Sequence, residues 1–204
     1  MRTRRAPALF TASLAAGCGL GTLDTAQTGQ DKPPNADEAA VMFDASRRVV
    51  VSVVSEAMDA VVNGESYLDA YAQDAGWVVT GDIKDRDGWT GLVTVDHGFV
   101  NLVAGAYQLE LPVHIDSAKF DTTGASIEGD LSVSATLHFD GAHPGSYLLD
   151  AAVTGELGGR LPDNWRVADV DYDLVMTYDA QAATYDWQAT GTVGDYDVSG
   201  WSDL

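Results

Sequence analysis

Residues 126–139 read SIEGDLSVSATLHF, and apolar and polar side chains alternate along this stretch. The odd-numbered positions carry Ile, Gly, Leu, Val, Ala, Leu and Phe, whereas the even-numbered positions carry Ser, Glu, Asp, Ser, Ser, Thr and His. Successive side chains of a β-strand point to opposite faces of its sheet. The stretch therefore predicts a strand that turns one face to a core and the other to water.

The same alternation recurs before and after this strand. It predicts the following inward positions: Leu109, Leu111, Val113, Ile115, Tyr147, Leu149, Ala151, Val153, Leu157, Val170, Tyr172, Leu174, Met176, Tyr178, Tyr185, Trp187, Ala189 and Val193. Segments rich in Gly, Asp, Thr and Ala have the composition of turns, and they lie at 85–88, 97–98, 122–124, 140–145 and 180–183. From Gly76 onward the chain therefore predicts an antiparallel meander of about eight or nine strands.

Four glycines, Gly91, Gly129, Gly155 and Gly191, fall on the inward rows of these predicted strands. Glycine within a strand usually marks a bend or a close approach by another element. Two interpretations remain open. Either the glycines bend the strands into a curved half-barrel or barrel, or they form a shallow trough that receives a helix.

A helix is predicted over residues 36–62, before the strands begin. Asn35 with Glu38 is a capping pair, and Asn63–Gly64 is typical of a helix end. An apolar stripe at helical spacing consists of Phe43, Val50, Val54, Ala57 and Val61. The β-branched run over 49–54 would also suit a buried strand. We expect Arg47 and Arg48 to lie at a solvated edge, paired with acidic residues.

The N-terminus has the pattern of a targeting segment. Arg2, Arg4 and Arg5 precede a short apolar run over 6–16, which is too short to span a bilayer as a helix. The run ends in LAAGC at 14–18, which resembles the lipobox of prokaryotic lipoproteins. The resemblance implies cleavage before Cys18 and attachment of lipid to its thiol. An ordinary secretory signal cut elsewhere is the alternative interpretation.

These features predict three segments: a signal peptide over 1–17, a flexible tether over 18–35 and a single domain over 36–204. Gly19 follows the Cys, and the absence of Asp there resembles lipoproteins that are sorted to an outer membrane. The predicted location is therefore the cell envelope, with a lipid anchor in the outer membrane.

The charge of the chain is strongly negative. The 204 residues carry 31 acidic and 11 basic side chains, a net charge of −20. Loss of residues 1–17 removes three arginines and leaves 8 basic residues, a charge of −23. Such a chain repels phosphate backbones, so nucleic acid is excluded as a partner. Its single Cys excludes a disulfide framework.

Motifs with a specific chemistry are absent: there is no nucleophile elbow, phosphate loop, dinucleotide fingerprint or zinc-protease helix. The weak metal candidates are Asp169, Asp171 and Asp173, which period two places on one wet face about 7 Å apart. Either this row is a solvated acidic surface or it binds calcium weakly. A second, weaker calcium candidate is the group at Asp82, Asp85 and Asp87.

No catalytic residue is predicted. The four histidines, His97, His114, His138 and His143, are scattered and are expected to be solvated. A hydrolase pair could be formed by Asp116 with Glu110 or Glu128, but such pairs are common in an acidic chain. We therefore expect no enzyme and no cofactor, apart from the weak calcium possibility.

Three functions remain for an anchored protein of this kind. The first is a non-enzymatic structural or binding role in the envelope, with an unknown envelope partner. The second is a carrier of a lipid or other apolar ligand between helix and sheet, since the predicted architecture resembles lipoprotein carrier folds at the level of fold. The third is an enzyme acting on envelope glycans. A filled interior favours the first, an apolar cavity the second, and a cleft with carboxylates of raised pKa the third.

Overall fold

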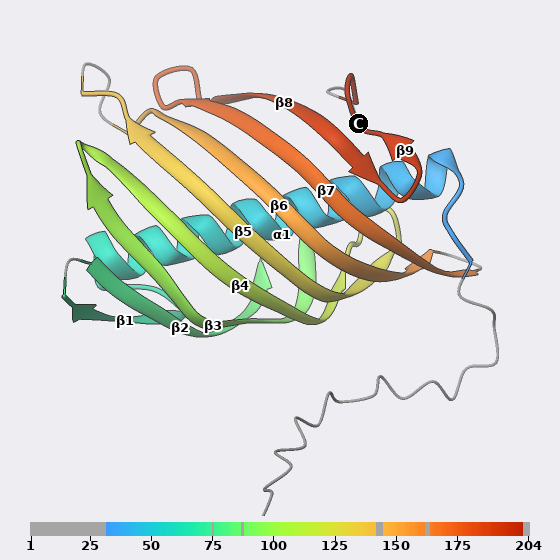
Figure 1. The fold of residues 1–204 in the computed structure, drawn as a ribbon, viewed down its shortest axis with the longest axis horizontal. Coiled ribbons are helices and arrows are strands. Elements are labelled where there is room, and N and C mark those ends of the chain that lie inside the picture. The colour runs from blue at the N-terminus through green and yellow to red at the C-terminus, as the bar shows by residue number, and fades with distance from the viewer. Residues whose placement is uncertain (1–31, 75, 87, 142–144, 162–163, 202–204) are drawn as a thin grey trace, which may run out of the picture. The chain divides into compact units, whose positions relative to one another are not determined.

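A computed structural model describes residues 32–74, 76–86, 88–141, 145–161 and 164–201. Within them the chain forms one helix and nine strands: α1 (Ala36–Val62), β1 (Leu68–Gln73), β2 (Gly76–Arg86), β3 (Trp89–Val103), β4 (Ala106–Lys119), β5 (Ser126–Phe139), β6 (Tyr147–Leu161), β7 (Asn164–Asp179), β8 (Thr184–Val193) and β9 (Tyr196–Asp197). The strands form a single antiparallel sheet in sequence order. The sheet is curved, and α1 lies across its concave face (Figure 1). The predicted helix on a curved meander is confirmed.

Both predicted ends of α1 are confirmed. The Asn35 side chain accepts a hydrogen bond from the Glu38 amide at 2.9 Å, and the Glu38 carboxylate accepts one from the Asn35 amide at 2.9 Å. Gly64 follows the helix at φ +68°, the left-handed conformation that ends many helices. The valines at 49–54 stay helical because Val49, Val50, Val53 and Val54 are buried against the sheet, and such packing outweighs their modest helix propensity.

The inward rows of the central strands form the core with α1. Leu109, Leu131, Val133, Leu149 and Leu174 are buried, as the alternation predicts. Phe139 and Tyr185 also lie on the predicted inward rows, but they are 47% and 59% exposed. Alternation places a side chain on a face, but it does not tell whether the helix covers that part of the face.

The glycines bend the strands. Gly129 has φ +134° and Gly155 has φ +153°, backbone conformations that residues with a Cβ rarely adopt. A Cβ at Gly129 would lie 2.3 Å from the carbonyl oxygen of Glu156, and one at Gly155 would lie 2.1 Å from that of Asp130. The nearest atoms belong to neighbouring strands and not to α1. The first interpretation, curvature of the strands, is therefore the one that holds.

One turn prediction needs correction. His97–Gly98 does not end a strand, because β3 continues through it with a register shift between Val95 and Phe99. His97 adopts φ +54° in this irregular stretch. The chain reverses instead at Ala104–Gly105, where both residues have positive φ, as a two-residue hairpin requires. The short strand β1, before Gly76, was not predicted.

Buried charges fasten α1 to the sheet. The carboxylate of Glu56 is buried; it pairs with Arg86 of β2 and accepts hydrogen bonds from the Ser66 hydroxyl at 2.7 Å and the Tyr67 amide at 2.9 Å. Nearby, the Trp89 indole donates to the Ser52 hydroxyl at 3.3 Å. The tip of the β2–β3 hairpin is thus bound to the middle of the helix.

Arg47 and Arg48 share one partner, the carboxylate of Asp44. Our expectation of a solvated edge is wrong for Arg47, whose side chain is only 14% exposed. Its guanidinium lies 4.5 Å from the ring centre of Trp187 in β8, so it also packs as a cation over an aromatic face. Ahead of the helix, the backbone of Lys32 forms an isolated parallel β-bridge with that of Arg166, and Pro34 is buried. Residues 32–35 therefore lie against the domain.

Candidate functional site

A pocket of about 170 Å³ lies between the C-terminal half of α1 and the inner face of the sheet. The helix contributes Val51, Val54, Ser55, Met58 and Asp59. These residues are spaced by three or four along the chain, and such a spacing places them on one face of a helix. One wall of the pocket is therefore a single helical face.

The opposite wall comes from the ends of three adjacent strands. Its residues are Leu137 and Phe139 of β5, Tyr147 and Leu149 of β6, and Met176 of β7, with Gly145 from the β5–β6 turn. Leu149 is the register partner of both Leu137 and Met176, so these side chains lie side by side on the inner face. The pocket is thus a gap in the contact between α1 and the sheet, near one end of the strands.

The lining of the pocket is mainly apolar. Among the described residues that line it, the polar side chains are those of Ser55, Asp59 and Tyr147. Burial, followed by the neighbouring tyrosines Tyr185 and Tyr178, raises the pKa of Tyr147 to about 12, so its phenol is neutral at physiological pH. A cavity with so few polar groups holds water poorly and favours an apolar guest.

A row of aromatic rings crosses strands β4 to β8 and passes the pocket. It consists of Tyr107, Phe139, Tyr147, Tyr178 and Tyr185, one from each of β4 to β8. Successive ring centres along the row are 6.0, 6.4, 5.3 and 4.7 Å apart. Because Phe139 and Tyr185 are about half exposed, the row offers an accessible apolar surface beside the pocket.

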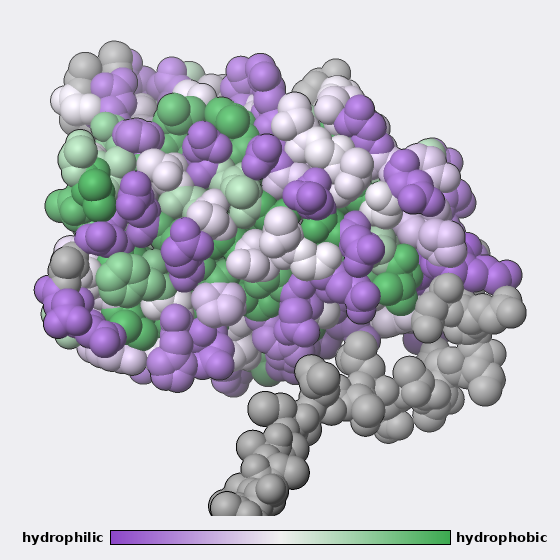
Figure 2. Space-filling model, viewed as in Figure 1, coloured by the Kyte–Doolittle hydropathy of each residue, from purple (hydrophilic) through white to green (hydrophobic). Residues whose placement is uncertain are grey.

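The outer face of the sheet is mainly hydrophilic, with hydrophobic residues gathered towards the end where the β3–β4 and β5–β6 turns lie (Figure 2). Exposed apolar side chains at that end include Leu102, Val103, Leu148 and Val175. The aromatic row and these residues therefore make one end of the domain more apolar than the rest of its surface.

The acidic row lies where period two predicts. Asp169, Asp171 and Asp173 of β7 are exposed, with Glu156 of β6 as the register partner of Asp169. Among the described residues, no three His, Cys, Asp or Glu side chains are grouped so that they could hold a metal ion. Calcium binding by this row stays a prediction.

In the second calcium candidate, the carboxylates of Asp82 and Asp85 both accept hydrogen bonds from β3. Asp82 accepts from the Thr94 hydroxyl at 2.8 Å, and Asp85 accepts from the Gly91 amide at 2.9 Å. Asp87, like His143, lies outside the described residues. The two described carboxylates thus hold strands β2 and β3 together.

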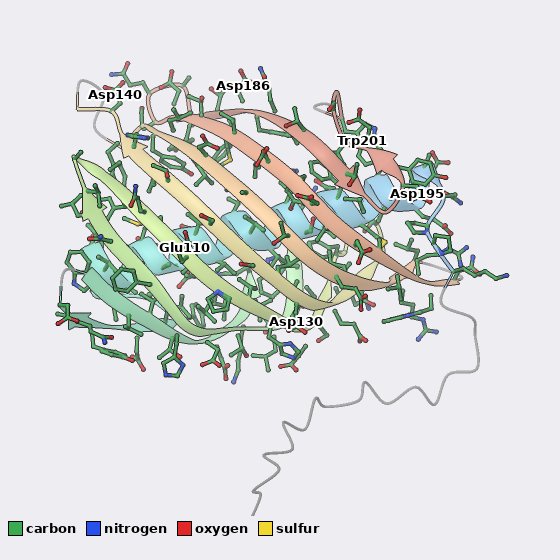
Figure 3. The ribbon with its side chains drawn as sticks, in the orientation of Figure 1. Glu110, Asp130, Asp140, Asp186, Asp195 and Trp201 are labelled. Atoms are coloured by element: carbon green, nitrogen blue, oxygen red, sulfur yellow. The ribbon has the colours of Figure 1, made fainter. Side chains whose placement is uncertain are left out.

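The proposed hydrolase residues lie on the outer face of the sheet. Glu110 and Asp130 are both on this face (Figure 3), and Glu110 accepts a hydrogen bond from the Ser134 hydroxyl at 2.8 Å. Asp116 is bonded to His114 at 3.2 Å, and the same imidazole reaches Asp130 at 2.6 Å. The Asp130 hydrogen bond raises the pKa of His114, and burial raises that of Glu128.

Sequence reasoning missed both the pocket and the His114 contacts. The register of β4 and β5 places His114 opposite Asp130, and no short motif encodes that pairing. The pocket depends on how closely α1 packs over β5 to β7, and the apolar rows of the sequence do not predict that distance.

No family model matches the chain, and comparison with curated proteins and with solved structures finds no match either. The predicted lipid-bearing Cys18 lies outside the described residues. In the described part of the chain, no helix has the length and apolarity needed to cross a membrane.

Proposed function

We propose that this protein is a lipid-anchored envelope protein that binds an apolar ligand between α1 and the sheet. The observation that carries the proposal is the apolar pocket beside a half-exposed aromatic row. An apolar cavity is the feature that separates a carrier from a purely structural protein, whose interior would be filled.

The size of the pocket limits what it can hold. At about 170 Å³ it is close to the engineered apolar cavity of about 150 Å³ that binds benzene. It is too small for a whole lipid. The pocket therefore suits a ring or the end of an alkyl chain, and the rest of a longer ligand would lie along the aromatic row.

The anchor would keep such a binding protein at a membrane. Cys18 is followed by 13 residues before Lys32, where the described domain begins. An extended segment of that length reaches about 40 Å, which leaves the domain free to meet ligands near the membrane surface. The sequence supports this part of the proposal through the lipobox-like segment.

The glycan-acting alternative gains little support from the described residues. Glu128 has a raised pKa, but it lies on the outer face of the sheet, as do Glu110 and Asp116. A glycosidase requires two carboxyl groups that flank a bound sugar in a cleft. Asp59 is the single acidic residue among the described residues that line the pocket.

Calorimetric titration with 1-octanol tests the proposal. The wild-type protein should bind it saturably, and Val54→Phe should abolish binding because the larger side chain fills the pocket. Val62→Phe is the matched control, since Val62 is 54% exposed at the end of α1 and does not line the pocket. Thermal unfolding would check that both variants are folded. Absence of octanol binding to the wild type, or equal binding to Val54→Phe, would refute the proposal.

A further inference from the structure

None of the described residues that line the pocket or form the aromatic row is Lys, Arg or His. Of the described lining residues, Asp59 alone is charged, and its side chain is partly exposed. The pocket therefore has an apolar interior and a negative charge that reaches solvent.

Asp59 stands at an unfavourable position for the stability of the helix. It lies in the last turn of α1, which has no basic residue, and carboxylates there oppose the helix macrodipole. Its side chain accepts one hydrogen bond, from the Asn63 amide group at 2.9 Å. A neutral Asn could accept the same bond, so the fold does not require the charge.

We infer that the pocket selects cationic amphiphiles, with an ammonium head at Asp59 and an apolar tail between Met58 and Leu149. This inference rests on the proposed function. A cation at the mouth would meet the Asp59 carboxylate and could also lie over the faces of the tyrosine rings, which attract cations. A neutral ligand with the same tail gains only the burial of its apolar surface.

An anionic amphiphile is disfavoured by the same charges. Asp186 lies on β8, directly after Tyr185 of the aromatic row (Figure 3). The predicted mature chain has a net charge of −23, so its field as a whole is negative. A carboxylate head would be repelled both by Asp59 and by the wider surface.

Three eight-carbon probes with the same tail test this inference: octylammonium, 1-octanol and octanoate. Calorimetric titration of the full chain should give the tightest binding for octylammonium, about twofold to fivefold tighter than 1-octanol, as expected for a partly exposed ion pair. Octanoate should bind most weakly. Raising the salt concentration should narrow the difference between octylammonium and 1-octanol.

Asp59→Asn identifies the group responsible. It should remove most of the preference for octylammonium over 1-octanol, measured as the ratio of the two affinities in the same variant, and Asp59→Glu should retain that preference. Asp171→Asn, which removes one equivalent charge from the outer face, is the matched control and should bind like the wild type. Equal binding of octylammonium and 1-octanol, or a preference that survives in Asp59→Asn, would overturn this inference and leave the proposed function intact. If none of the probes binds, the proposed function itself fails.

Discussion

Replacing Gly129 by alanine should strongly destabilise the domain, although alanine adds only one methyl group. Gly129 adopts φ +134°, and its Cβ would stand 2.3 Å from the carbonyl oxygen of Glu156 and 3.1 Å from the Cα of Leu157. Both contacts are to the backbone of β6, which cannot move aside without opening the β5–β6 pairing. Gly155 has the mirror-image problem, with a Cβ 2.1 Å from the Asp130 oxygen on β5.

Two terms set the size of the effect. Holding a residue other than glycine in such a conformation costs about 1–3 kcal/mol. Overpacking against the neighbouring strand costs about 1–3 kcal/mol more. We therefore expect Gly129→Ala and Gly155→Ala each to lower the free energy of unfolding by roughly 2–6 kcal/mol, a large part of the roughly 5–15 kcal/mol that is typical of a domain. Because the two sites share the β5–β6 pairing, the double variant should lose less than the sum.

Urea unfolding followed by circular dichroism would measure this effect. Gly141→Ala is the control, because a Cβ there has no neighbour within 4 Å and Gly141 is not in the left-handed region. It should change the free energy of unfolding by less than about 0.5 kcal/mol. If Gly129→Ala and Gly155→Ala are as stable as Gly141→Ala, these glycines do not bend the strands and our account of the curvature is wrong.

Three further predictions concern the outer face and the anchor. The Asp130 hydrogen bond raises the pKa of His114 in the folded protein. The stability that this imidazole contributes should therefore be complete below its ordinary pKa of about 6.5 and be lost as the pH rises through the higher pKa of the folded state. Urea unfolding midpoints should show this loss in the wild type and not in His114→Gln. Cys18→Ser should move the protein from the detergent phase to the aqueous phase in a partition assay, and continued partition into detergent would contradict the lipoprotein assignment. Millimolar Ca²⁺ should raise the melting temperature only slightly beyond NaCl of matched ionic strength; a saturable increase that disappears in Asp171→Asn would instead establish a calcium site.

Much of the fold could be predicted from local patterns. The capping pair at Asn35 and Glu38 and the Gly64 end fix α1, and period two fixes which face each central strand turns inward. The glycine rows predict either bent strands or a trough for the helix, and only the structure decides between them, because the atoms nearest to Gly129 and Gly155 belong to neighbouring strands. The pair His97–Gly98 predicts a turn because Gly is frequent in turns, whereas in the structure it marks an irregular stretch of β3 in which His97 has φ +54°.

The candidate site could not be predicted to the same extent, because it depends on relations between elements. Phe139 and Tyr185 follow the inward pattern, yet their exposure depends on where α1 stops covering the sheet. Asp59 reads in the sequence as one of several helix charges, and only packing places it at the pocket. The buried pair of Glu56 and Arg86 likewise joins residues 30 positions apart.

Methionine methyl NMR tests the central claim, ligand binding between α1 and the sheet, most directly. Met58 and Met176 line the pocket from opposite walls, whereas Met42 is buried in the N-terminal half of α1 and does not line it. Titration of the ¹³C-methyl-labelled protein with 1-octanol should shift the Met58 and Met176 signals saturably and leave the Met42 signal in place. Unchanged signals at Met58 and Met176, or equal shifts at all three, would contradict binding in this pocket.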